Sequence, residues 1–160
     1  MNLVQIGSGS ADLDENFSDG FTNFAKGLKN KKNIFIIEAN SLHLKSLKKS
    51  WKNEKNIKIF NLAITPDNYK NKKITFYYCS LDTPNYQIFS NSYNFVKRHF
   101  KYGIIKSKIV DAMCISVFLK KFINNKVDYL SLDIEGMDFD VIYHIKFNKI
   151  NILNISFEHI

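Results

Sequence analysis

Two carboxylates follow the end of a buried-looking strand late in the chain. In the stretch "VDYLSLDIEGMDFDVI" they are Asp133 and Glu135, and Gly136 comes next. Carboxylates at the mouth of a strand can face a ligand crevice, where they orient a substrate hydroxyl and accept its proton. The alternative is that they cap the following helix and bind its free amides. In either case Gly136 lets the backbone turn sharply between strand and helix.

A glycine-rich turn follows the first predicted strand. The stretch "QIGSGSAD" places Gly7 and Gly9 in the pattern G-x-G-x-G/A, with Ala11 at the third position. The missing side chains of such a turn let the backbone approach a ligand closely. A tight turn that binds no ligand would have the same sequence, so this motif indicates a binding site only in combination with others.

The second predicted strand ends in an acidic residue, Glu38. At that place an acid can accept hydrogen bonds from both ribose hydroxyls of a nucleoside, or it can simply favour the start of the next helix. The loop after the glycine turn contains four more acids, Asp12, Asp14, Glu15 and Asp19. They would repel a diphosphate. S-adenosylmethionine carries a sulfonium and an ammonium group, so the loop favours this methyl donor over NAD.

The elements that must position these residues are strands alternating with helices. Short runs rich in branched residues predict strands at residues 2–7, 33–39, 57–64, 73–80, 106–114, 127–134 and 150–159, of which 106–114 is expected to be irregular. Such alternation favours parallel pairing through right-handed crossovers. We therefore expect an α/β fold with an open, doubly wound, mostly parallel sheet and a ligand site beyond the carboxyl ends of its strands.

Helices are expected between these strands. Apolar residues recur at helical spacing within residues 21–28, 44–51, 115–125 and 137–145. Candidate N-caps are Ser18 and Asp19 for the first helix, and Asn40 or Ser41 for the second. Residues 80–100 are interpreted as a polar and aromatic loop or a short helix.

Amino-acid composition and net charge indicate the number of domains and the kind of partner. Hydrophobic residues make up 45% of the 160 residues, which predicts a single domain over residues 1–160 with its own core. The net charge of +8 comes from scattered lysines, with Arg98 the only arginine. A phosphate-binding protein would be expected to use more arginine, so nucleic acid is not the expected partner.

The absence of a long apolar run and of a signal peptide favours a cytoplasmic protein.

Five stretches occur in a recognisable order: "VQIGSGSADLDENF", "IFIIEAN", "IFNLAIT", "YLSLDIEGMDFDVI" and "NISFEH". Together they resemble the successive motifs of the FkbM-type S-adenosylmethionine-dependent methyltransferases. The resemblance covers most of the chain and is weakest in the insertion between about Tyr69 and Lys126. It implies a Rossmann-like class I methyltransferase fold with S-adenosyl-L-methionine as the cofactor.

The resemblance also implies a cofactor-binding set, consisting of Gln5, Gly7, Ser8, Gly9, Glu38, Ala39, Ala63, Ile64 and Asp133. Residues 7–9 would hold the methionine end of the cofactor and Glu38 its ribose. Residues 63–64 would edge the adenine. The chain departs from the family pattern at Gln5, where many methyltransferases of this fold carry an acid, and at Ala11, which stands at a glycine position.

The candidate catalytic residues are Asp133, Glu135 and His159. By the same resemblance, the two carboxylates would line the pocket where the methyl group is delivered. His159, at the end of the last predicted strand, is an alternative base because histidine titrates near neutral pH. A divalent ion such as Mg²⁺ on Asp133, Glu135 and Glu158 would lower the pKa of an alcohol, although nothing in the sequence fixes such a site. The remaining histidines are interpreted as surface or core residues: His43, His99 and His144.

The expected activity is O-methylation of a sugar, a glycan or a small metabolite, with the acceptor set by the variable insertion. Two alternatives remain. The sequence stops at "ISFEHI", just past the fifth expected core strand, where methyltransferases of this fold usually continue into two further strands. A truncated or degenerate domain acting as a binding module is therefore the first alternative. The second, prompted by the positive charge, is a ribose methyltransferase acting on RNA.

Overall fold

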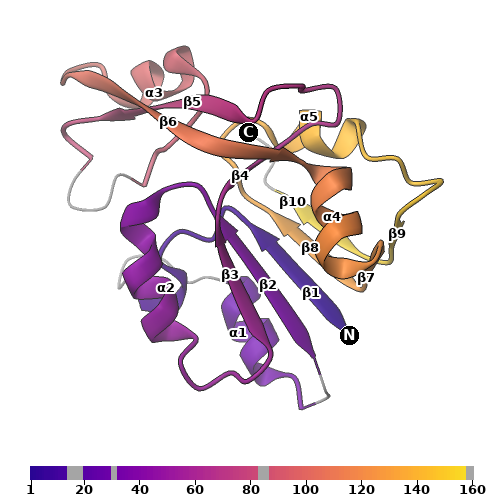
Figure 1. Cartoon of the computed structure of the whole chain (residues 1–160). Helices are drawn as coiled ribbons and strands as arrows, with labels where there is room; N and C mark the ends of the chain where they lie inside the picture. The colour runs from indigo at the N-terminus through magenta and orange to yellow at the C-terminus, as the bar shows by residue number, and fades with distance from the viewer. Residues whose placement is uncertain (14–19, 30–31, 83–86, 158–160) are drawn as a thin grey trace.

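The computed structural model describes residues 1–13, 20–29, 32–82 and 87–157. Within these residues the main sheet has five parallel strands in the order β10-β8-β1-β2-β3. They are β1 (Asn2–Ile6), β2 (Asn33–Glu38), β3 (Ile57–Asn61), β8 (Tyr129–Leu132) and β10 (Ile155–Phe157). The chain proceeds from β1 to β3 and then crosses to β8 and β10 on the other side of β1 (Figure 1). The strand order therefore reverses between β1 and β8.

Alternate residues of the central strands point to opposite faces of the sheet, and each face has its own core. On one face, Leu3 of β1 and Ile36 of β2 are fully buried with Trp51, which follows α2. The helices of this face are α1 (Gly20–Gly27) and α2 (Leu44–Ser50). These two helices cover this face over the half of the sheet that contains β1, β2 and β3.

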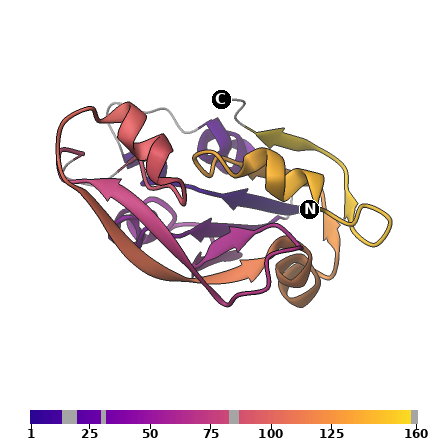
Figure 2. The same ribbon diagram turned by 90° about the horizontal axis from the view of Figure 1, so that it is seen from above.

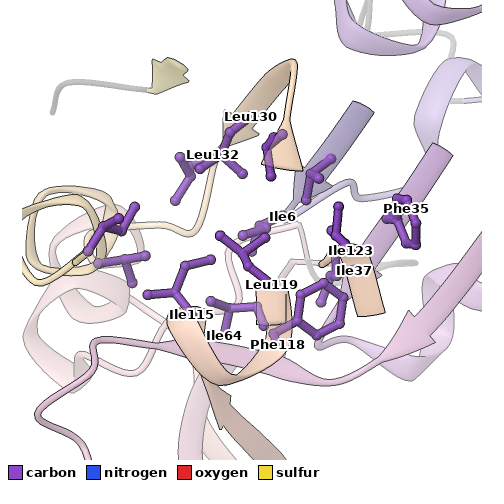
Figure 3. Packing of buried hydrophobic residues seen from close by; sticks show 14 of the residues in the cluster. Ile6, Phe35, Ile37, Ile64, Ile115, Phe118, Leu119, Ile123, Leu130 and Leu132 are labelled. Carbon is purple, nitrogen blue, oxygen red and sulfur yellow. The ribbon is translucent and has the colours of Figure 1, made fainter. Parts of the chain in front are cut away.

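The opposite face carries the larger core. Ile6 of β1 and Ile37 of β2 pack with residues of α4 (Ile115–Ile123) and α5 (Asp138–Tyr143), as Figure 3 shows for α4. Phe118 of α4 is fully buried, and burial of a side chain of this size contributes roughly 2–3 kcal/mol. With helices on both faces of a parallel sheet, the predicted doubly wound α/β architecture is confirmed for the described residues.

A second, smaller sheet lies beside the carboxyl ends of the main strands (Figures 1 and 2). Its strands are β4 (Ala63–Thr65), β5 (Lys73–Cys79) and β6 (Ile105–Cys114), in the order β4-β6-β5. β5 and β6 pair antiparallel along their length, whereas β4 and β6 are parallel. The connection between β5 and β6 contains α3 (Tyr93–His99). Short elements complete the fold: the 3-10 helices η1 (Ala11–Leu13) and η2 (Ser41–His43), and the strand pair β7 (Lys126–Val127) with β9 (Asn151–Ile152).

Several predicted strands are divided in the structure. The predicted strand 57–64 is interrupted at Leu62, whose N–H donates to the carbonyl of Glu38 at 3.1 Å. The chain then leaves the main sheet, and β4 pairs with β6 instead. The predicted strands 127–134 and 150–159 are likewise each divided into a short outer strand and a core strand. In contrast, the strand expected to be irregular near residues 106–114 is a continuous ten-residue strand, β6.

The predicted helices are all present. α1 keeps its predicted length, shifted by one residue, and α2, α4 and α5 are shorter than predicted. Asn40 is the N-cap of η2, which leads into α2, and its side-chain oxygen accepts from the N–H of Leu42 at 3.2 Å. Within the region 80–100, Ser92 caps a short helix, α3. The other candidate caps, Ser18 and Asp19, lie outside the described residues. None of the helices in the described part of the chain combines the length and the apolar character that crossing a membrane requires.

Candidate active site

A cavity of about 550 Å³ opens at the carboxyl ends of β1, β2 and β8, where the strand order of the main sheet reverses. This is the place where open α/β sheets bind ligands, and the volume lies in the range of small-molecule sites. The cavity brings together ten of the residues singled out from the sequence: Gln5, Gly7, Ser8, Gly9, Glu38, Ala39, Ala63, Ile64, Asp133 and Glu135. His159 and Glu158 lie outside the described residues.

Gly7 fixes the junction between β1 and its two neighbouring strands. Its N–H donates to the carbonyl of Ile37 in β2 at 2.9 Å. On the other side, a Cβ atom at position 7 would lie 1.7 Å from the carbonyl oxygen of Asp133, and φ of Gly7 is +77°. Only glycine satisfies both the conformation and the approach. The Asp133 N–H in turn donates to the carbonyl of Ile6 at 2.9 Å, so the backbone of Asp133 is held by the main sheet.

The remainder of the glycine turn faces the cavity. Gly9 has φ +51°, and among the described residues only the Gln87 side chain comes within 4 Å of where its Cβ would be, at 3.7 Å. Ser8 is buried, and its Oγ has no hydrogen-bond partner in the described structure. Ala11, at the third position of the motif, adopts the left-handed conformation expected of the glycine it replaces, with φ +58°. The backbone geometry of the motif is therefore kept despite the substitution.

Glu38 joins the end of β2 to the glycine turn. Its carboxylate is buried and accepts hydrogen bonds from the Gly9 N–H at 2.8 Å and from the Asn40 N–H at 2.6 Å. Burial raises the pKa of Glu38 to about 7, although the hydrogen bonds from the backbone of Asn40, Gly9 and Ser8 act in the opposite direction. The negative charge of Asp133 raises the pKa slightly further. Glu38 is therefore a buried carboxyl group that titrates near neutral pH.

The acidic turn after β8 has an unusual backbone. Glu135 and Gly136 both have positive φ, +52° and +99°, so the chain reverses sharply before α5, as Gly136 predicted. The acids in the first turn of α5 are Asp138 and Asp140. The carboxylate of Asp138 accepts from the Ile134 N–H at 3.3 Å. This arrangement leaves Asp133 and Glu135 outside the first helical turn, at the cavity.

The cavity also contains residues that the sequence did not single out. His43, interpreted from the sequence only as a surface or core residue, is buried, and its Nδ1 lies 2.7 Å from the Ser10 Oγ. Five Phe and Tyr side chains also line the cavity and form its aromatic wall: Phe21, Phe76, Phe89, Tyr129 and Phe157. Phe76 and Phe89 belong to the insertion, and their rings stack with centroids 4.8 Å apart. Their cavity position follows from the fold of the insertion, which no local pattern revealed.

The cation site considered from the sequence has little support in the structure. Among the described residues, no three His, Cys, Asp or Glu side chains form a group that could hold a metal ion. Asp133 and Glu135 line the cavity, whereas the third candidate ligand, Glu158, falls outside the described part of the chain.

A second hollow lies at the opposite, amino-terminal end of the strands. It is lined by the starts of β1, β2 and β3 and by the end of α4, and it contains four lysines, Lys55, Lys58, Lys120 and Lys121. No Asp or Glu of the described residues lines it. Ligands of open α/β sheets bind at the carboxyl ends of the strands, so the first cavity remains the candidate active site.

Parallel α/β sheets with a cavity at the reversal of strand order form the large class of nucleotide-binding folds. Within that class, comparison with protein families identifies a methyltransferase: the model described as the Methyltransferase FkbM domain matches residues 6–160. The chain therefore belongs to the FkbM methyltransferase family and is an S-adenosylmethionine-dependent methyltransferase. No curated protein and no solved structure was found to match the chain significantly.

Proposed function

We propose that this methyltransferase transfers the methyl group of S-adenosylmethionine to a hydroxyl oxygen of a sugar, a glycan or a small metabolite. The observation that carries the proposal is the meeting of three features in one cavity: the glycine turn, Glu38, and the carboxylates Asp133 and Glu135. The first two suit a nucleoside cofactor, and the carboxylates suit a hydroxyl acceptor.

The cavity residues fit the cofactor. The glycine turn leaves open space beside Gly9, and the Ser8 Oγ is a buried polar atom that has no hydrogen-bond partner among the described residues. Both features suit the polar methionine end of the cofactor. The carboxylate of Glu38 can accept from the ribose hydroxyls, while residues 63–64, buried and apolar, would edge the adenine.

The bound cofactor supplies a methyl group on a positively charged sulfur, which is an electrophile for a nucleophilic oxygen. Asp133 and Glu135 would accept hydrogen bonds from the acceptor hydroxyl and hold its oxygen in line with that methyl group. As the oxygen–carbon bond forms and the carbon–sulfur bond breaks, the hydroxyl proton would pass to one of these carboxylates.

The aromatic wall favours a carbohydrate-like acceptor. Pockets for small molecules combine apolar and aromatic walls with a few polar groups that fix orientation. Here Phe76 and Phe89 come from the insertion and Tyr129 from β8, and Gln87 and Ser131 add polar atoms nearby. Rings of this kind can cover the apolar face of a sugar while the polar groups bind its hydroxyls.

The direct test is titration of the folded protein with S-adenosylmethionine by calorimetry, followed by transfer of a labelled methyl group to a panel of saccharides and small alcohols. We expect saturable binding at one site and label in at least one hydroxylated acceptor. Folded protein that gives no heat with S-adenosylmethionine and no transfer would instead support the degenerate binding module.

Cofactor affinity should depend on pH through Glu38. Ribose hydroxyls donate hydrogen bonds, so they bind the ionised carboxylate better than the neutral acid, and the pKa of Glu38 is raised to about 7 by burial. Affinity for S-adenosylhomocysteine should therefore weaken by roughly tenfold as the pH falls from about 8 to about 6. The Glu38→Gln variant lacks this titration, and its weaker affinity should vary little over the same range. Equal pH profiles for the two proteins would exclude Glu38 from ribose binding.

One observation favours a second candidate, the ribose of RNA as acceptor. Four lysines line the second hollow, and its lining within the described part of the chain includes no acid, so an extended polyanion could bind there. A variant with all four changed to glutamine should then flatten the salt dependence of RNA binding. The matched control changes four exposed lysines near α2, Lys45, Lys48, Lys49 and Lys52. Equal losses in both variants would indicate nonspecific attraction to a positively charged protein.

A further inference from the structure

Ser90 connects the insertion to the acidic turn of the candidate active site. Its Oγ donates to the carbonyl oxygen of Glu135 at 2.7 Å, across 45 positions of sequence. The same Oγ accepts from the N–H of Ser92 at 3.1 Å. Ser90 is fully buried, so both of these bonds are shielded from water.

The backbone of Ser90 is equally well fixed. Its N–H donates to the carbonyl of Tyr77 in β5 at 3.1 Å, and its carbonyl accepts from the Tyr77 N–H at 2.6 Å. Ser90 is thereby held against the second sheet by a pair of β-type hydrogen bonds. The residues just before it, 87–89, line the cavity, whereas Ser90 itself does not.

The two candidate catalytic carboxylates, Asp133 and Glu135, are therefore anchored differently. The backbone of Asp133 is held by the main sheet, through the Ile6 carbonyl and the close contact with Gly7. Glu135 lies two residues further on in a left-handed conformation, φ +52°, which is unfavourable for a residue with a side chain. Such a conformation persists only where surrounding contacts hold it, and the bond from Ser90 to the Glu135 carbonyl is one of them.

We propose that Ser90 is a positioning residue, which holds Glu135 in the orientation needed for methyl transfer and couples it to the insertion. This inference rests on the proposed function of the cavity. It explains how the segment 87–89, which lines the cavity, is linked to a carboxylate that lines the same cavity. Because residues 87–89 precede Ser90 directly, displacement of this segment would also displace the Glu135 turn.

The test compares Ser90→Ala with Ser92→Ala. Both variants remove one serine hydroxyl from the same segment, and the Ser92 Oγ caps α3 by accepting from the Phe95 N–H at 3.2 Å without contacting Glu135. We expect Ser90→Ala to lower kcat on the order of 10- to 100-fold, whereas Ser92→Ala should keep wild-type kcat. Affinity for S-adenosylhomocysteine should stay unchanged in both, because Gly7 and Asp133 keep their anchors. Ser90→Thr, which retains the hydroxyl, should recover most of the lost kcat.

A double-mutant cycle separates positioning from general destabilisation. If Ser90 acts through Glu135, the Ser90→Ala change should have no further effect on kcat in a Glu135→Gln background. The backbone carbonyl ¹³C shift of Glu135 should also move in Ser90→Ala and not in Ser92→Ala, which can be measured without any acceptor. Wild-type kcat in Ser90→Ala, additive losses in the cycle, or an unmoved carbonyl shift would each overturn the inference. Failure of the wild type to bind cofactor would instead count against the proposed function.

Discussion

Gly7→Ala should abolish cofactor binding and lower the free energy of unfolding by about 3 kcal/mol or more. The added Cβ would stand 1.7 Å from the carbonyl oxygen of Asp133, far inside the contact distance, and the residue would have to keep φ near +77°. The clashing atom belongs to the backbone, so no side-chain rotation can relieve the overlap. Relief requires β1 and β8 to separate at the point where the cavity begins.

Gly27→Ala is the matched control for this prediction. Gly27 is the last residue of α1, and no atom of another described segment lies within 4 Å of where its Cβ would be. Alanine is the better helix former, so this variant should be as stable as the wild type or slightly more stable. Chemical denaturation and titration with S-adenosylhomocysteine measure the two effects. A Gly7→Ala protein with unchanged stability would show that the turn and the Asp133 carbonyl are not packed as described.

Asp133→Asn and Glu135→Gln should each lower the rate of methyl transfer by a factor on the order of 10² to 10⁴. Both changes keep the size of the side chain and remove its capacity to accept a proton as a carboxylate. Glu135→Gln should leave affinity for S-adenosylhomocysteine unchanged, because Glu135 is expected to act on the acceptor. Asp133→Asn is expected to weaken cofactor affinity as well, since Asp133 also belongs to the proposed cofactor set.

Single-turnover transfer of labelled methyl groups measures these losses, with Asp140→Asn as the control. Asp140 is an exposed acid in the first turn of α5 and does not line the cavity, so its loss should not change the rate. Equal transfer by the wild type and both active-site variants would remove the carboxylates from the mechanism. His159 would then become the first residue to test as the base.

Much of the site could be predicted because it lies at strand ends. Apolar runs predicted β1, β2 and β8, and parallel strands end at the same edge of a sheet. Gly7, Glu38 and Asp133 each follow or end one of these strands, so their place at one edge of the sheet follows from the strand assignment, and the strand order β8-β1-β2 makes them neighbours at the cavity. Residues 63–64 line the same cavity although the predicted strand that contained them is divided at Leu62.

Local patterns predicted the strands β5 and β6 of the insertion but not where the insertion lies against the main sheet and the cavity. The run at 57–64 is apolar except for Lys58 and Asn61, and nothing in it indicates that β3 stays in the main sheet while β4 pairs with β6, where Ala112 is the partner of Ala63. The aromatic residues that the insertion brings to the cavity were therefore missed. His43 was missed for a related reason, because its contact with Ser10 joins two turns that are far apart in sequence.

The sequence by itself indicated the strands of the main sheet and the residues at their carboxyl ends, because side-chain periodicity and glycine conformation are local properties. Only the tertiary structure determined which strands pair with β6 and that the Ser90 hydroxyl binds the Glu135 carbonyl. It also determined the burial of Glu38, which raises the pKa of that residue to about 7. Each of these depends on contacts between segments distant in sequence. Such contacts are selected by the packing of the whole chain, which no short stretch encodes.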